Sequence, residues 1–252
     1  MALAGKHALV TRGGRGIGRA IAAALAGAGA VVTVVGRSEA PLRAAVAAGA
    51  AAGCAVADVT DVAEIRRQVT AAEAARGAIA ILINNAGSVQ TGAFVKADPS
   101  VFQAMWDVHV MGAVYATQAV LPGMIERGFG RIVNVASTSG LRGYPYVSAY
   151  CAAKHALVGL TRALAAETAT RGVTVNAVCP GYTDTDLVRD SIARVAATTG
   201  RARTDVLAAY AKDAPIGRLI RPEEVAAAVL YLCSPDAAAV TGTTLAVAGG
   251  EM

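Results

Sequence analysis

The chain has 252 residues, a net charge of +5 at pH 7, and 55% hydrophobic but only 4% aromatic residues. That composition excludes an intrinsically disordered chain, and the length is enough to bury one sizeable core. The positive charge is dispersed, with no Lys/Arg run longer than two residues, which argues against a nucleic-acid-binding protein.

The longest apolar runs argue against a membrane protein. Ile79–Ile83 and Leu245–Ala248 are far shorter than the roughly 20 residues that a spanning helix needs. Met1–Lys6 has no signal-peptide pattern, and the four cysteines lie far apart without metal-ligand spacing. We therefore expect a cytoplasmic protein with reduced thiols, no metal site, and no membrane or nucleic-acid partner.

Short apolar segments alternate with Ala- and Leu-rich segments of helical length. The expected strands are His7–Thr11, Val31–Val35, Ala55–Val59, Ile79–Ile83, Arg131–Val135, Val173–Val178 and Thr244–Val247. The expected helices include Arg19–Ala28, Val62–Arg76 with Asp61 as its N-cap, Pro99–Leu121 and Ser148–Thr170. This alternation predicts an α/β fold: a single-domain, doubly wound (Rossmann-type) parallel sheet of about seven strands with helices on both faces.

One long segment interrupts the alternation. Between Gly181 and Pro222 the chain has a loop followed by sequence of helical character. An insertion of this length in a compact α/β domain is usually functional. We expect residues 182–221 to form a substrate lid on the single domain 1–252, at the carboxyl ends of the strands, where such sheets bind ligands.

The first strand runs directly into a glycine-rich turn, Thr11-Arg12-Gly13-Gly14-Arg15-Gly16-Ile17-Gly18, and then into a helix. Glycines let the backbone approach a pyrophosphate closely, and the helix N-terminus offers free N–H groups and a positive dipole end. The turn therefore predicts a dinucleotide site that includes Gly13, Arg15, Gly16, Ile17 and Gly18.

The end of the second strand predicts which dinucleotide binds. NAD sites usually carry an acidic residue there for the ribose 2′-hydroxyl, but this chain has Gly36-Arg37-Ser38. Arg37 and Arg15 can flank a 2′-phosphate, because guanidinium groups match phosphate oxygens. We expect NADP(H) in preference to NAD(H); the alternative is that both arginines are solvated surface residues.

Tyr150 and Lys154 are four residues apart near the start of the predicted helix Ser148–Thr170, so their side chains share one helical face. A nearby ammonium group favours the phenolate, and we expect it to lower the pKa of Tyr150 towards working pH. Ser137 follows the fifth strand and can donate to a substrate oxygen beside the tyrosine. The three residues predict general acid–base catalysis.

Together these motifs resemble the short-chain dehydrogenase/reductase superfamily over the whole chain. The shared features are the glycine-rich turn, Asp58, Asn84-Asn85-Ala86-Gly87, Ser137 with Tyr150 and Lys154, and the segment from Asn176 through Pro180-Gly181 to Thr185. The resemblance implies that Asp58 meets the adenine, Asn85 and Ala86 the adenosine-side ribose and central scaffold, and Thr185 the nicotinamide carboxamide. Lys154 would also hold the nicotinamide ribose, and Tyr150, Gly87, Pro180 and Gly181 would complete the cofactor site.

Two positions depart from the family pattern. Arg12 replaces a glycine, so it either strains the backbone, if φ is positive, or adds a third cation near the adenosine phosphates. His109 replaces an asparagine that fixes a water in a proton relay from Lys154. It is either a fourth catalytic residue that holds this water through a ring nitrogen or a satisfied core histidine.

The expected substrate pocket mixes apolar and polar side chains: Ser88, Val89, Gln90, Tyr144, Tyr146, Val147, Tyr182 and Leu187. The segments 130–138, 175–181, 215–218 and 222–225 look most similar to 3-ketoacyl and polyketide ketoreductases. The resemblance therefore implies a small-molecule ketone or alcohol substrate, with acyl thioesters among the candidates. Arg127, Arg131 and Arg171 either meet an acidic carrier protein or a CoA phosphate, or are solvated surface charges.

The leading hypothesis is an NADP(H)-dependent oxidoreductase that interconverts a ketone and a secondary alcohol. One alternative is an NAD-dependent secondary alcohol or hydroxyacyl dehydrogenase, and another is a non-catalytic NADP(H)-binding sensor, against which the intact Ser137, Tyr150 and Lys154 argue. The apolar faces of Pro99–Leu121 and Ser148–Thr170 predict pairing across a two-fold axis, in keeping with the family's homotetramer. His7, His155 and Trp106 are expected to be structural.

Overall fold

In the computed structural model of the protein, seven parallel strands form one sheet in the order β3-β2-β1-β4-β5-β6-β7, and residues 1–212 and 214–251 are described. The strands are β1 (His7–Thr11), β2 (Val31–Gly36), β3 (Gly53–Val56), β4 (Ile79–Asn84), β5 (Gly130–Val135), β6 (Val173–Pro180) and β7 (Thr244–Val247). The strand order reverses between β1 and β4, and this confirms the predicted doubly wound fold.

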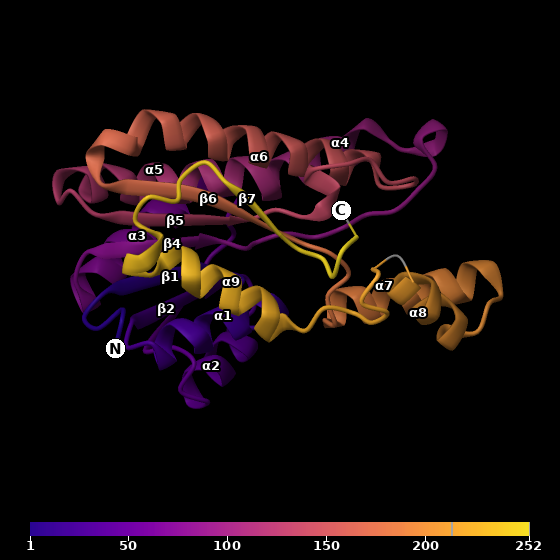
Figure 1. Cartoon of the computed structure of the whole chain (residues 1–252), viewed down its shortest axis with the longest axis horizontal. Helices are drawn as coiled ribbons and strands as arrows, with labels where there is room; N and C mark the ends of the chain where they lie inside the picture. Colours follow the sequence, from indigo (N-terminus) through magenta and orange to yellow (C-terminus); the bar gives the residue numbers. More distant parts are fainter. Residues whose placement is uncertain (213, 252) are drawn as a thin grey trace.

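Helices cover both faces of the sheet (Figure 1). One face carries α1 (Gly16–Gly27), α2 (Glu39–Ala47) and α9 (Pro222–Cys233), and the other carries α3 (Val62–Arg76), α4 (Pro99–Trp106), α5 (Gly112–Glu126) and α6 (Ser148–Thr168). Every residue of β1, β4, β5 and β6 is buried between these layers. Their continuous β-branched runs follow from burial on both sides.

Two further helices, α7 (Asp186–Thr199) and α8 (Arg203–Lys212), occupy much of the segment between β6 and β7. They project beyond one end of the sheet rather than covering a face (Figure 1). Because α7 follows the carboxyl end of β6, this is the end of the sheet at which doubly wound folds bind ligands.

The boundaries of some elements differ from those expected from the sequence. Hydrogen bonding, rather than the apolar pattern, decides where these elements begin and end. β3 lies at Gly53–Val56 instead of Ala55–Val59, because its register pairs Val56 with Gly36 at the end of β2. Asp58 then folds the chain into a turn by accepting from the backbone N of Thr60 at 3.0 Å. The N-cap prediction for α3 is confirmed, since Asp61 accepts from the backbone N of Glu64 at 3.0 Å.

The expected helix Pro99–Leu121 is longer than predicted and irregular at its centre. It continues through Pro122 to Glu126, and a five-residue π-helical turn, Asp107–Met111, separates α4 from α5. The stretch is long and apolar enough to cross a membrane by length and composition, yet 44% of its most apolar window is buried inside the fold. We interpret it as a core helix. His109 lies within the π-helical turn, which has one more residue than a regular α-helical turn. The residues on either side of this turn are therefore out of register with a single regular α-helix.

Candidate active site

The carboxyl ends of the parallel strands bring distant sequence positions to one edge of the sheet. The strands lie in the order β3, β2, β1, β4, β5 and β6 along this edge. The residues of interest just after their carboxyl ends are, in the same order, Asp58, Arg37, Arg12, Gly87 and Ser137, and β6 itself ends at Pro180. The strand order reverses between β1 and β4, and this reversal point is where the ligand-binding crevice of a doubly wound fold is expected. The predicted cofactor and catalytic residues all gather along this edge.

The glycine-rich turn is packed too tightly for side chains. A Cβ on Gly13 would lie 2.4 Å from Val34, and one on Gly18 would lie 2.3 Å from the Arg12 carbonyl oxygen. Gly16 has a φ of +49°, and a Cβ on it would lie 3.1 Å from the methyl group of Thr185, the N-cap of α7. The turn and the segment after β6 therefore meet, as the resemblance implied.

The N-terminus of α1 offers its own binding groups. Its N-cap, Arg15, makes no side-chain capping bond, and its first turn has no acidic residue. The opening N–H groups thus keep their positive dipole end available, which fits a pyrophosphate.

Thr11 joins the glycine-rich turn to the turn after β4, a role that the sequence reasoning missed. Its hydroxyl accepts from the backbone N of Asn85 and of Ala86, both at 2.9 Å. The amide of Asn85 in turn donates to the Thr11 carbonyl at 3.0 Å. The Asn85 side chain therefore holds the two turns together, and the threonine that opens the turn was the available signal.

Arg37 lies where the sequence placed it, at the end of β2. Its guanidinium is 3.8 Å from the Asp58 carboxylate, and both side chains are solvent-accessible, so they can face a ligand. Arg37 and Arg15 each lower the pKa of Arg12, although burial has the larger effect on that pKa. Three guanidinium groups thus share one end of the edge, and this arrangement fits a ligand with several phosphates.

Tyr150 and Lys154 project from the first turns of α6 towards the end of β5. The ammonium of Lys154 donates to the Val135 carbonyl at 2.7 Å and lies 5.6 Å from the centroid of the Tyr150 ring. Ser137 interacts with Tyr150 and favours its phenolate form, which lowers the pKa of Tyr150, although burial has the larger and opposite effect on that pKa. The structure therefore brings the three predicted catalytic residues together.

The pKa values depart from the sequence expectation. Loss of hydration raises the pKa of Tyr150 to about 12, and the opposing effects of Ser137 and Arg12 are smaller. Burial also lowers the pKa of Lys154 to about 7. The prediction that Lys154 lowers the pKa of Tyr150 was wrong, because burial of the tyrosine outweighs the charges around it and the lysine is itself desolvated.

His109 is buried, and its ring packs against the backbone of the turn after β4. Its Nε2 lies 2.7 Å from the Ser88 carbonyl oxygen, and a Cβ on Gly87 would lie 2.4 Å from its Cε1. Burial and the charge of Lys154 hold its pKa well below 6.5. The neutral ring must therefore donate from Nε2 to the carbonyl, which leaves Nδ1 as a buried acceptor with no partner among residues 1–212 and 214–251.

The predicted substrate residues come from three segments around Tyr150. Ser88, Val89 and Gln90 precede Gly92, whose N–H donates at 2.8 Å to the carbonyl of Tyr146, so the first two segments touch. Tyr146 is 67% exposed with a φ of +65°, and Val147 caps α6. In the third segment, Tyr182 stacks on Tyr210 of α8 with ring centroids 4.3 Å apart, and Leu187 opens α7.

Glu251 belongs to this site, and nothing in the local sequence signalled it. Its buried carboxylate accepts from Arg142 at 3.0 Å and from the Tyr144 hydroxyl. A Cβ on Gly181 would lie 2.6 Å from its other oxygen, which has no partner among the described residues. Glu251 thus ties the predicted substrate loop to the turn after β6.

Three arginines lie at the opposite edge of the sheet. Arg127 donates to the carbonyl of Ile79 at the start of β4, Arg131 lies at the start of β5, and Arg171 precedes β6. Arg131 is only 5% exposed and caps the Gly130 carbonyl at 2.9 Å. Arg131 is therefore not a solvated surface charge, and contact of these arginines with a carrier protein or a CoA phosphate stays a prediction.

The remaining singled-out side chains have local roles. His7 bonds to Gly77 at 2.6 Å and to Thr33 at 2.8 Å, and His155 is exposed and bonds to the Cys151 carbonyl at 2.9 Å. Trp106 is 43% exposed, so it is less packed than expected. Within residues 1–212 and 214–251, no three His, Cys, Asp or Glu side chains form a metal-binding group, and the four cysteines are free.

Comparison with known proteins agrees with this geometry. A family model described as enoyl-(acyl carrier protein) reductase matches residues 13–251. The chain belongs to the short-chain dehydrogenase/reductase family. It is therefore an oxidoreductase that acts on CH–OH and C=O groups with a nicotinamide cofactor.

Several family members resemble the chain over nearly all its length. It is 43% identical to 2-(S)-hydroxypropyl-CoM dehydrogenase 3 of Xanthobacter autotrophicus, covering 96% of this chain and 94% of the relative. It is 39% identical to the 3-oxoacyl-(acyl-carrier-protein) reductase of Vibrio harveyi, covering 99% and 98%. A variant of actinorhodin polyketide ketoreductase crystallised with NADPH superposes with a TM-score of 0.94 at 37% identity, covering 98% of this chain and 97% of that one.

Proposed function

We propose that the protein is an NADP(H)-dependent carbonyl reductase that converts a ketone into a secondary alcohol. The observation that carries the proposal is the convergence of Ser137, Tyr150 and Lys154 beside a glycine-rich turn flanked by arginines. The crystallised ketoreductase neighbour holds NADPH, which supports the choice of cofactor.

Each side chain has a defined part in this reaction. Bound NADPH supplies the hydride. Tyr150 stays protonated at neutral pH because its pKa is about 12, so it can donate a proton to the oxygen of the reduced carbonyl. Ser137 donates a hydrogen bond to the same oxygen. Lys154, whose ammonium lies beside the Tyr150 ring, returns a proton to the Tyr150 phenolate.

The substrate is proposed to be a 3-ketoacyl thioester or a similar small ketone. Relatives named as 3-oxoacyl-(acyl-carrier-protein) reductase and acetoacetyl-CoA reductase support an acyl thioester. Residues 182–221, with α7 and α8, are proposed to act as a lid over the pocket formed by Ser88, Gln90, Tyr144, Tyr146, Val147, Tyr182 and Leu187. Tyr182 and Tyr210 stack within this segment and give it a rigid aromatic pair.

Turnover of a panel of ketones, including acetoacetyl-CoA, with NADPH and NADH in separate reactions tests this function, and the matching alcohols are assayed with NADP+ and NAD+. We expect reduction of at least one ketone with NADPH. Tight NADPH binding without turnover of any substrate would instead support the sensor hypothesis.

Arg37 is predicted to set the preference for NADPH. In the Arg37→Ala variant, the affinity for NADPH is expected to fall about tenfold or more while that for NADH changes little, because only NADPH carries the 2′-phosphate. Titration of nicotinamide fluorescence measures both affinities. Arg19→Ala, an exposed position on α1, is the matched control. Equal losses for both cofactors would contradict the assignment.

His109 is proposed to hold the relay water through its unpartnered Nδ1. His109→Leu removes this acceptor, so we expect kcat to fall about tenfold to a hundredfold, with recovery in His109→Asn. Protonation blocks Nδ1 only below the depressed pKa, so the wild type should lose activity in an acidic limb that His109→Asn lacks. Identical pH–rate profiles for all three proteins would rule out the relay role.

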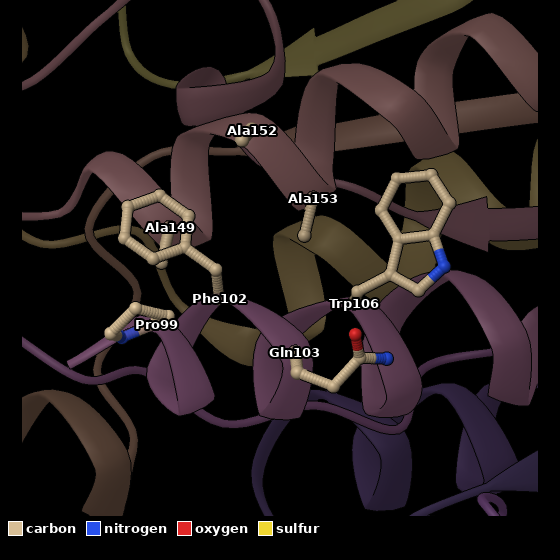
Figure 2. A pocket seen from close by; sticks show the side chains of 7 residues that line it. All are labelled: Pro99, Phe102, Gln103, Trp106, Ala149, Ala152 and Ala153. Atoms are coloured by element: carbon tan, nitrogen blue, oxygen red, sulfur yellow. The ribbon is translucent and has the colours of Figure 1, made fainter.

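We also propose that the protein is a homotetramer and that it is located in the cytoplasm. A pocket of about 250 Å³ lies between α4 and α6. Figure 2 shows the side chains that line it, which are those of Pro99, Phe102, Gln103, Trp106, Ala149, Ala152 and Ala153. The aromatic rings of Phe102 and Trp106 flank the small alanines of α6, and a second copy would cover this apolar surface. Analytical ultracentrifugation of the wild type and of Trp106→Glu tests the assembly.

A further inference from the structure

The side chain of Arg12 spans the crevice at which the strand order reverses. Arg12 follows β1, and its Nη1 donates at 2.7 Å to the carbonyl of Gly87, which follows the neighbouring strand β4. This bond joins the glycine-rich turn to the second turn directly over the crevice. Any dinucleotide laid along this edge must pass the Arg12 guanidinium.

The backbone of Arg12 is firmly held, although arginine is an unfavourable residue there. Its φ is +51°, in the left-handed region that favours glycine. Its carbonyl oxygen packs closely against Gly18, where an added Cβ would lie only 2.3 Å from it. The same oxygen accepts a hydrogen bond from the Asn85 side-chain amide at 3.4 Å. The backbone therefore cannot rotate away, and only the side chain is free to change partners.

The charge of Arg12 has no close counter-ion. Among the described residues, no carboxylate lies within ion-pairing distance of it, whereas Arg37 has Asp58 at 3.8 Å. Arg15 and Arg37 both act on Arg12 repulsively. The guanidinium thus donates to a neutral carbonyl rather than to a carboxylate, and a phosphate oxygen can replace that acceptor.

We propose that Arg12 binds the pyrophosphate of the dinucleotide, exchanging the Gly87 carbonyl for a phosphate oxygen. The inference rests on the proposed function. The uncapped N-terminus of α1, which marks a pyrophosphate position, begins four residues after Arg12. Arg37 lies one strand farther towards the adenosine end, where the 2′-phosphate is expected.

Loss of Arg12 and loss of Arg37 should therefore have different effects on the affinities for NADPH and NADH. NADPH and NADH share the pyrophosphate, so loss of Arg12 is expected to weaken both by the same factor, about tenfold to a hundredfold for a charge-assisted hydrogen bond. Loss of Arg37 is expected to weaken NADPH alone. Arg12 is thus a general affinity residue in this protein, not a second reader of the 2′-phosphate.

Binding of NADPH, NADH, ADP and AMP to the wild type, Arg12→Gly, Arg12→Asn and Arg37→Ala tests this assignment. Nicotinamide fluorescence and calorimetry report affinity without any turnover, and glycine and asparagine both tolerate a positive φ. Thermal melting without ligand checks that each variant is folded. We expect both Arg12 variants to weaken NADPH, NADH and ADP in parallel, with a smaller effect on AMP, which lacks the pyrophosphate.

Other results would overturn the proposal. Unchanged or tighter binding by Arg12→Gly would mean that Arg12 merely bridges or obstructs the crevice, and a loss confined to NADPH would make it a 2′-phosphate contact. If the wild type binds neither cofactor, the proposed function itself fails. If it binds both but reduces no ketone, only the catalytic proposal fails, and the Arg12 comparison still stands.

Discussion

Replacing Tyr150 by phenylalanine is expected to lower kcat for ketone reduction by about a thousandfold. The change removes one oxygen atom, the proton donor, and keeps the ring that packs edge-on against His109 with centroids 5.2 Å apart. The affinity for NADPH should remain, because the turns that form the cofactor site are untouched. Steady-state rates, together with fluorescence titration of NADPH, separate the two effects.

The matched control for this substitution is Tyr231→Phe, on α9 and 47% exposed. It removes a phenolic hydroxyl outside the site and should leave kcat unchanged. Retention of more than about a tenth of the wild-type kcat in Tyr150→Phe would contradict the assignment of the proton donor.

Replacing Lys154 by methionine is expected to lower kcat about a hundredfold or more and to change how stability depends on pH. The folded-state pKa of Lys154 is about 7, below its ordinary value of 10.5, because the side chain is buried. The unfolded chain therefore binds more protons between these values. Lys154 destabilises the fold fully below pH 7, and this cost disappears as the pH rises towards 10.5.

Urea denaturation at pH 6, 8 and 10 measures this effect. The stability of the wild type relative to Lys154→Met should rise with pH across that range, because methionine has no titrating group. A constant difference would show that Lys154 keeps an ordinary pKa in the folded protein, and a difference that falls with increasing pH would show that its pKa is raised; either would contradict the prediction.

The pKa values of Tyr150 and Lys154 fit the proposed direction, ketone reduction. A tyrosine whose pKa is raised is a poor base at neutral pH but a persistent proton source. The adjacent lysine, with a pKa of about 7, can exchange protons at working pH. This pairing of a high-pKa donor with a near-neutral neighbour arises from burial on α6, which the spacing of Tyr150 and Lys154 alone does not reveal.

Boundary errors show where sequence patterns lose information. The apolar run Ala55–Val59 predicted a strand two residues too late, because pairing with β2 decides where hydrogen bonding begins and ends. The helix after Pro99 was predicted without its π-turn, since apolar spacing does not report a single inserted residue. Arg131 looked like a surface charge, but only the packing of β5 between two helical layers shows that it is buried.

By itself, the sequence determined the doubly wound sheet, the glycine-rich turn and the pairing of Ser137 with Tyr150 and Lys154, because alternation and short-range spacing encode these features locally. Tertiary structure alone decided the positive φ of Arg12, its bond across the crevice to Gly87, and the link from Glu251 to Tyr144. These contacts join residues 75 and 107 positions apart in the chain. A local sequence pattern carries no information about contacts between residues so far apart in the chain. The parallel sheet makes these contacts possible because it brings the carboxyl ends of all its strands to one edge.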